Sequence, residues 1–177
     1  WRENRAAGKA SMLFCYALGK VQRILAELSK LTDDPVYLHG SMLPLTKAYK
    51  KAGVKMLEAL PATLENKNVD FSGALVCAPP SAQGTTWMRR FGEHSTAFAS
   101  GWMAIRGNRR RRGYDRGFVV SDHADWPSLL NTIRETQAER IFVTHGQNDI
   151  LSRYLSEAGH NARELETLYG QDPEDDG

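Results

Sequence analysis

Three histidines each follow a short apolar segment that is typical of a buried strand: His39, His123 and His145. In α/β sheets the carboxyl ends of the strands face the binding crevice, so a histidine there can bind a metal or transfer a proton. A single His-Gly after a strand is more often a hydrogen-bonded turn residue, which is our interpretation of His39. His94 and His160 lie in a polar stretch and past a helix end, and we expect both to be structural or exposed.

His123 and His145 stand out because a single predicted helix separates the strands that precede them. The two strands can therefore be neighbours in one sheet, with both imidazoles at the same edge. Two histidines form only a partial metal site, since a catalytic zinc ion needs at least three protein ligands and an open position. The sequence has no HxHxDH cluster, HExxH helix or CxxC pair to supply the others. From these residues alone we predict a partial site with missing ligands.

Arginine is concentrated in residues 84–118, where eight arginines and two acidic residues give a local charge of +6 on a chain of net charge +2. Tryptophan, phenylalanine and tyrosine are interleaved with these arginines, and such a mixture can grip phosphates and stack on bases. A solvated, flexible loop is the alternative. We favour nucleic-acid contact, through Arg89, Arg90, Arg106, Arg109, Arg110, Arg111, Arg112 and Arg116.

The elements that must position these residues alternate between strand and helix, which predicts an α/β fold with a parallel sheet and right-handed crossovers. Gly19-Lys20 joins the first strand to the first helix, and without the full GxxxxGK[ST] pattern we interpret it as a tight turn. Strands are expected at Met12–Leu18, Val36–Leu38, Ala74–Ala78, Thr96–Ala99, Phe118–Ser121, Arg140–Val143 and Ala162–Leu168. Helices are expected at Lys20–Leu31, Leu43–Ala52, from Pro127 to about Thr136, and at Asn148–Ala158.

The bulk composition is that of a soluble protein, with 41% hydrophobic and 25% charged residues. No run of about 18 apolar residues exists, so we expect no membrane span. Cys15 and Cys77 lie in apolar runs, which predicts two buried, reduced thiols and a cytoplasmic location. The start at Trp1, without an initiator Met or an apolar signal core, is typical of sequence from within a longer protein.

Several segments resemble those of the metallo-β-lactamase/β-CASP nuclease family. Ser121–Asp125 resembles its second motif, S-x-H-x-D, and Val143–Gly146 resembles its third, V-H-G. Phe14–Arg23 is similar to the segment that follows the family's first acidic motif. Other blocks resemble the bacterial ligase-associated DNA exonuclease branch, which is mRNA 3′-end processing factor-like: Ala78–Ala82, Arg89–Gly92, Ala99–Met103 and Asp115–Phe118. The resemblance extends to about Tyr169.

The resemblance implies that residues 1–115 are part of a β-CASP domain and that residues 116–170 supply the last strands and helices of a metallo-β-lactamase αββα fold. Residues 171–177 would be an acidic tail. It also implies that His123 lies beside the scissile phosphate and that His145 binds one of two zinc ions (Zn²⁺). The remaining ligands of the family have no counterpart in this chain, which we therefore expect to be inactive alone.

The implied function is that of the C-terminal part of a zinc-dependent exonuclease that acts on DNA in repair, with a DNA ligase as a possible partner. Two alternatives remain open. His145 is also the residue found in RNA-processing relatives, which would make the protein an RNA 3′-end-processing nuclease. The chain could instead be a catalytically inactive fragment that only binds nucleic acid.

Overall fold

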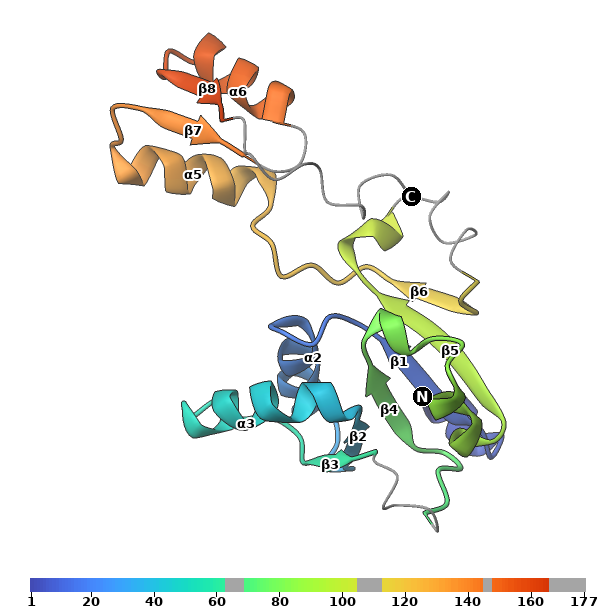
Figure 1. Cartoon of the computed structure of the whole chain (residues 1–177). Helices are drawn as coiled ribbons and strands as arrows, with labels where there is room; N and C mark the ends of the chain where they lie inside the picture. Colours follow the sequence, from blue (N-terminus) through green and yellow to red (C-terminus); the bar gives the residue numbers. More distant parts are fainter. Residues whose placement is uncertain (63–68, 105–112, 145–147, 166–177) are drawn as a thin grey trace. The chain divides into compact units, whose positions relative to one another are not determined.

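The computed structural model describes residues 1–62, 69–104, 113–144 and 148–165 of the chain (Figure 1). They belong to two compact units, Trp1–Asp122 and His123–Gly177. The family resemblance implies a domain boundary between residues 115 and 116, and this boundary stays a prediction. In the structure the strand that begins at Arg116 is part of the sheet of the first unit.

The first unit is built on a sheet of six parallel strands in the spatial order β3-β2-β4-β1-β5-β6. The prediction of an α/β fold with a parallel sheet is thereby confirmed. The strands are β1 (Ala10–Phe14), β2 (Val36–Leu38), β3 (Ala59–Pro61), β4 (Leu75–Ala78), β5 (His94–Ala99) and β6 (Arg116–Phe118).

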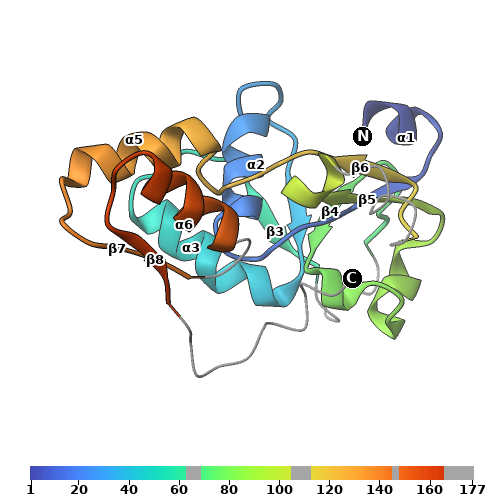
Figure 2. The same cartoon turned by 90° about the horizontal axis from the view of Figure 1, so that it is seen from above.

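Helices cover one face of this sheet, where α2 (Lys20–Leu28) and α3 (Leu43–Lys51) lie side by side (Figures 1 and 2). Val21 and Leu25 of α2 are fully buried there against alternate strand residues such as Leu38 and Cys77. Because successive strand residues point to opposite faces, Phe14 belongs to the second core cluster, on the other face. Short 3₁₀ helices at Pro80–Ala82, Thr86–Phe91 and Gly101–Ala104 contribute to that second cluster.

Several strand predictions were wrong at one end or both, and the sheet explains two of these differences. The strand expected to reach Leu18 stops at Phe14, which is the last residue of β1 that pairs with its neighbours, with Ala78 at the end of β4 and with Phe98 of β5. The strand expected at Phe118–Ser121 lies earlier, at Arg116–Phe118, because its partner β5 ends at Ala99. In both cases the apolar run continues past the last residue that has a neighbour to pair with.

The two buried thiols expected from the apolar runs are present as free cysteines. The hydrogen bond between the Cys77 and Cys15 thiols raises the pKa of Cys77, and burial raises it further. The 3₁₀ helices were not predicted, and neither were the edge strand β3 and the helix α1 (Arg2–Ala6). The proline at the end of β3 fits an edge strand, where a missing N–H donor costs little.

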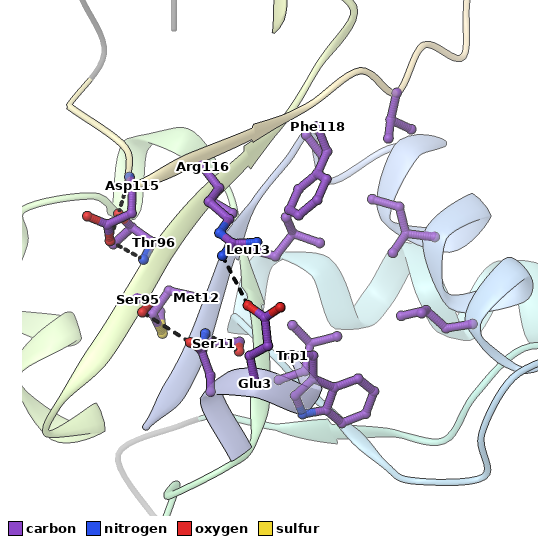
Figure 3. Close-up of a pocket in the computed structure, with 17 residues that line it drawn as sticks. Trp1, Glu3, Ser11, Met12, Leu13, Ser95, Thr96, Asp115, Arg116 and Phe118 are labelled. Carbon is purple, nitrogen blue, oxygen red and sulfur yellow. Dashed lines mark hydrogen bonds and ion pairs between the residues drawn. The ribbon is translucent and has the colours of Figure 1, made fainter. Parts of the chain in front are cut away.

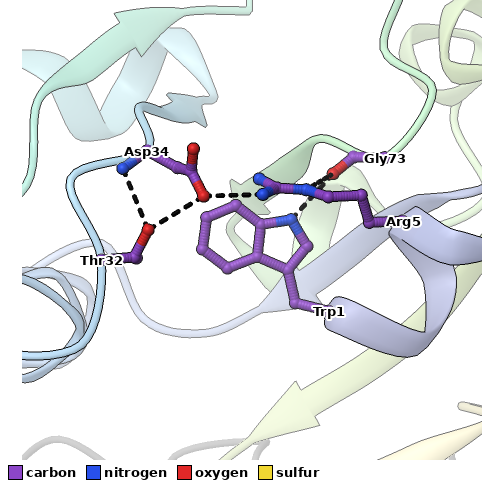
Figure 4. Close-up of polar contacts among 5 residues, drawn as sticks. All are labelled: Trp1, Arg5, Thr32, Asp34 and Gly73. Carbon is purple, nitrogen blue, oxygen red and sulfur yellow. Dashed lines mark hydrogen bonds and ion pairs between the residues drawn. The ribbon is translucent and has the colours of Figure 1, made fainter.

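Helix α1 buries no residue of its own and is held by side-chain bonds to distant parts of the first unit (Figure 4). The Trp1 indole donates a hydrogen bond of 2.8 Å to the Gly73 carbonyl, and Arg5 lies 2.7 Å from the carboxylate of Asp34. Thr32 donates a second hydrogen bond to that carboxylate. The bond from Arg5, followed by the one from Thr32, holds the pKa of Asp34 below its usual range.

The second unit contains α5 (Trp126–Thr136), β7 (Ile141–Val143), α6 (Asn148–Glu157) and β8 (Ala162–Glu164), with β7 and β8 paired in parallel. Val143 and Leu155 are its buried apolar residues in the described part. The final strand was expected to reach Leu168 but ends at Glu164, before the described Leu165, and residues 166–168 of that prediction lie outside the described residues. No described helix combines the length and apolarity that a membrane crossing requires.

We predict that Phe14→Ala destabilises the first unit by about 3–5 kcal/mol, the usual cost of removing a buried phenylalanine ring. The Phe14 side chain is fully buried and its ring lies 5.3 Å from that of Tyr114. Urea unfolding followed by tryptophan fluorescence would measure this loss. Leu31→Ala is the matched control, because Leu31 is 71% exposed. Equal effects of the two substitutions would contradict the assignment of the core.

Candidate functional site

The candidate site lies at the carboxyl ends of β1 and β5, which are neighbours in the centre of the sheet. From β1 the chain continues through α2 to β2 on one side of this pair, and from β5 it continues to β6 on the other side. Such a reversal of strand order opens a crevice at the carboxyl edge, where ligands of α/β proteins usually bind. The loop 15–19 follows β1, and Ser100 and Gly101 follow β5.

The segment after β6 returns to this edge and carries the Ser-Asp-His sequence. Ser100 forms backbone hydrogen bonds with Phe118, at 3.1 Å, and with Val120, at 3.4 Å. The side chain of Ser121 then lies against Gly101, where a Cβ atom would be 3.5 Å from the serine Cβ and Oγ atoms. These contacts bring Ser121 and Asp122 to the carboxyl ends of β1 and β5.

A buried lysine contacts this segment from the first turn of α2. The Lys20 side chain is 3% exposed, and its Nζ lies 3.1 Å from Oδ1 of Asp122. The same ammonium group lies 4.7 Å from the centre of the Tyr16 ring. Because an unpaired buried ammonium group is strongly destabilised, the partner carboxylate and the ring stabilise Lys20 in its buried position.

The loop between β1 and α2 is held by Gln22, whose side chain is buried. Its amide nitrogen donates hydrogen bonds to the Ala17 carbonyl, at 3.0 Å, and to the Thr46 hydroxyl of α3, at 3.1 Å. Gly19 has a φ of +77°, which favours glycine, and it forms the sharp turn into the helix. The prediction of a tight strand-to-helix turn at Gly19-Lys20 is confirmed.

His123 is exposed and is the first residue of the second unit. The last residue of its motif, Asp125, caps α5, because its carboxylate accepts a 2.9 Å hydrogen bond from the backbone N–H of Ser128. Hydrogen bonding by the Ser128 side chain, followed by that of its backbone N–H, holds the pKa of the Asp125 carboxyl below its usual range. Asp125, the second aspartate of the Ser121–Asp125 motif, therefore has a structural role as the cap of α5.

The expectation that the strands before His123 and His145 are neighbours in one sheet was wrong. In the described residues β6 is the last strand of the six-stranded sheet, whereas β7 pairs with β8 in a separate two-stranded sheet. The structure describes only part of the predicted site. His145, Arg106 and Arg109–Arg112 lie outside the described residues. Among the residues that are described, no group of three or more histidine, cysteine, aspartate or glutamate side chains could hold a metal ion. The described part of the chain therefore does not by itself fit a zinc site.

The described arginines of the basic block differ in their surroundings. Arg89 is exposed, whereas Arg90 lies over the Trp87 ring and donates a hydrogen bond of 3.0 Å to the carbonyl of the same residue. Arg116 is exposed and forms an ion pair of 3.0 Å with Glu3. Arg89 and Arg116 can therefore reach solvent directly, while Arg90 is partly committed to packing.

The turn interpretation of His39 is confirmed. Its Nδ1 accepts a hydrogen bond of 3.2 Å from the backbone N–H of Ser41 at the start of a 3₁₀ helix, Gly40–Met42. Partial burial lowers the pKa of His39, and the positive charge of Arg90 lowers it further. His39 is therefore a capping residue that favours the neutral imidazole.

Sequence reasoning missed a pocket of about 400 Å³ in the first unit (Figure 3). It is lined by residues of α1, α2 and the strands β1, β5 and β6, among them Leu13, Ile24 and Phe118. The ion pair between Glu3 and Arg116 lies beside it. The pattern of alternating apolar residues on the strands indicates a covered sheet face but gives no sign that a cavity remains there.

Sequence reasoning also missed the pairing of Lys20 with Asp122. The residues of this site that could have been suspected from sequence are the Gly-Lys at a helix start and the aspartate next to His123. Neither signal indicates that the other is its partner, because the two are far apart in the chain and come together only through the order of the strands.

Comparison with known protein families finds no family that matches this chain. A protein of Opitutus terrae named "Probable DNA ligase" is 32% identical to it over 160 residues. The similarity covers 90% of this chain but 15% of that much longer protein. The chain is thus similar to one segment of a large polypeptide, and its own activity is a matter for proposal.

We predict that Asp125→Ala lowers the stability of α5, because the cap to the Ser128 N–H is lost, whereas Asp125→Ser retains a capping oxygen. The folded-state pKa of Asp125 is lowered from its ordinary 3.8, so the stabilisation by the carboxylate is present above that pH and is lost as the pH falls through the lower folded value. Hydrogen exchange of α5 amides, measured from neutral to acid pH, would show this. Exchange that is the same in Asp125→Ala and wild type would contradict the cap.

Proposed function

We propose that this chain is the C-terminal part of a zinc-dependent phosphodiesterase that acts as an exonuclease on DNA. The observation that carries the proposal is the placement of the Ser-Asp-His segment. Ser121 and Asp122 lie at the carboxyl ends of central parallel strands, next to the reversal of strand order, and His123 follows directly. α/β folds usually bind their substrates at this edge of the sheet, so a catalytic group that lies here would be close to a bound substrate.

The resemblance of Ser121–Asp125 and Val143–Gly146 to the nuclease motifs gives these residues their proposed roles. His123 would stand beside the scissile phosphate and protonate or stabilise the leaving oxygen, which is general acid catalysis. His145 would bind one zinc ion, and the remaining ligands would come from another part of a longer polypeptide. Bound zinc would supply an activated water and charge stabilisation at the phosphate.

The basic block supports a nucleic-acid substrate. Arg89 and Arg116 are exposed on the first unit, and contacts of arginine with phosphates supply affinity for any strand. The similarity to a segment of a protein named as a probable DNA ligase favours DNA over RNA, and it favours a DNA ligase as the working partner. An RNA-processing nuclease is the second candidate, because the third motif carries histidine at position 145 as RNA-processing relatives do.

The decisive experiment measures zinc content and cleavage of single-stranded DNA and RNA. It compares this 177-residue chain with a longer polypeptide that includes an HxHxDH region. We predict about two zinc ions and DNA cleavage for the longer protein, and neither for this chain alone. In the longer protein, His123→Ala should lower kcat by roughly 10²–10⁴-fold, the usual contribution of a general acid.

His160→Ala serves as the matched control, since His160 lies past the end of α6 and belongs to neither motif. A longer protein without zinc and without cleavage would contradict the proposal and favour a chain that only binds nucleic acid. Cleavage of RNA but not of DNA would favour the second candidate. His145→Ala should also reduce the zinc content, which distinguishes a metal ligand from a residue that contacts substrate.

A further inference from the structure

The ion pair between Lys20 and Asp122 lies at the last residue before His123. We propose that Lys20 is a positioning residue, which holds Asp122 at the start of α2 and thereby fixes the backbone from which His123 extends. The inference rests on the proposed function, since it assigns to His123 a role that requires a defined position.

Burial and charge show that the Lys20–Asp122 contact differs from the other ion pairs of the described residues. The Lys20 side chain is 3% exposed and that of Asp122 is 31% exposed, whereas every other pair in the described part has both side chains more than 40% exposed. Exposed pairs contribute little, while a buried charge that loses its partner is strongly destabilised. Lys20 therefore has a strong preference for the arrangement that keeps Asp122 in place.

Helix α2 holds the segment at two consecutive residues. Lys20 contacts the Asp122 carboxylate, and Arg23, which lies three residues further along the same helix face, donates a hydrogen bond to the Ser121 carbonyl. The first turn of a helix also favours a carboxylate, because its free N–H groups carry partial positive charge. Lys20, Arg23 and the N-terminus of α2 thus all stabilise the position of Ser121 and Asp122.

The absence of a side chain at Gly19 gives Asp122 the space to approach. A Cβ atom at Gly19 would lie 3.0 Å from Oδ2 of Asp122, and the φ of +77° disfavours any other residue there. Gly101, which follows β5, is close to Ser121 in the same way. The segment therefore lies close to two glycines that follow neighbouring strands.

Because Asp122 and His123 are consecutive residues, the contacts that hold Asp122 also restrict the position of the His123 backbone. Asp122 is bonded to His123, and only His123 and Ala124 separate it from Asp125, whose carboxylate caps α5. His123 therefore follows directly on the anchored Asp122. A misplacement of about 1 Å in a catalytic group can cost roughly 10²-fold in rate, so the loss of one anchor should be visible in catalysis.

The test uses the complete polypeptide with Lys20→Met, which removes the charge and retains a long apolar side chain. We expect kcat on single-stranded DNA to fall about 10- to 100-fold while KM changes less than about twofold, because positioning and not binding is affected. Hydrogen exchange at residues 119–124 should become faster in the same variant. Lys20→Arg keeps the charge and should restore part of the rate.

Lys30→Met is the matched control, because Lys30 pairs with Glu27 at the exposed end of the same helix and should leave kcat and the exchange at 119–124 unchanged. If Lys20→Met fails to fold, Asp122→Asn tests the same contact from its more exposed partner. Unchanged exchange at 119–124 would overturn the proposal, and so would faster exchange with an unchanged kcat. An inactive wild-type polypeptide would instead contradict the proposed function, and the exchange data would then decide separately whether the pair holds this segment.

Discussion

The parallel direction of all six strands in the first unit is the constraint on which the candidate site depends. Because the strands run the same way, the loops after β1 and β5 and the segment after β6 reach one edge of the sheet. The connections from β1 and β5 lead to opposite sides of the sheet, which is the arrangement in which α/β proteins usually bind their ligands. Lys20 and Asp122 meet in that region, and neither would be near the other in an antiparallel arrangement of the same elements.

The site is held together by charge that is taken out of water. Burying the Lys20 ammonium group is unfavourable unless a partner is present, and Asp122 and the Tyr16 ring provide one. The contact is therefore more directional than apolar packing, since the buried ammonium group needs a carboxylate close to it. Gln22 extends the same principle to the loop, because its buried amide nitrogen holds both the loop and α3.

A structural feature could be predicted from sequence when the interactions that fix it join residues close together in the chain. Local patterns predicted Val36–Leu38 with the correct ends and α5 to within a residue, because apolar runs and the proline after Trp126 act over a few positions. Strand ends at β1 and β6 were misjudged because they depend on where the partner strands stop. The contact of α2 with Ser121 joins residues that are 98 positions apart, and nothing local to either indicates it.

The central claim is that His123 and His145 belong to one phosphodiesterase site, and a crystal structure of the complete polypeptide with zinc and a phosphorothioate DNA strand tests it most directly. The account predicts a zinc ion about 2.0–2.1 Å from a ring nitrogen of His145. It also predicts the His123 imidazole within about 3 Å of the leaving oxygen of the bound strand. A zinc ion that has no bond to His145, or a DNA strand that lies away from His123, would contradict the account.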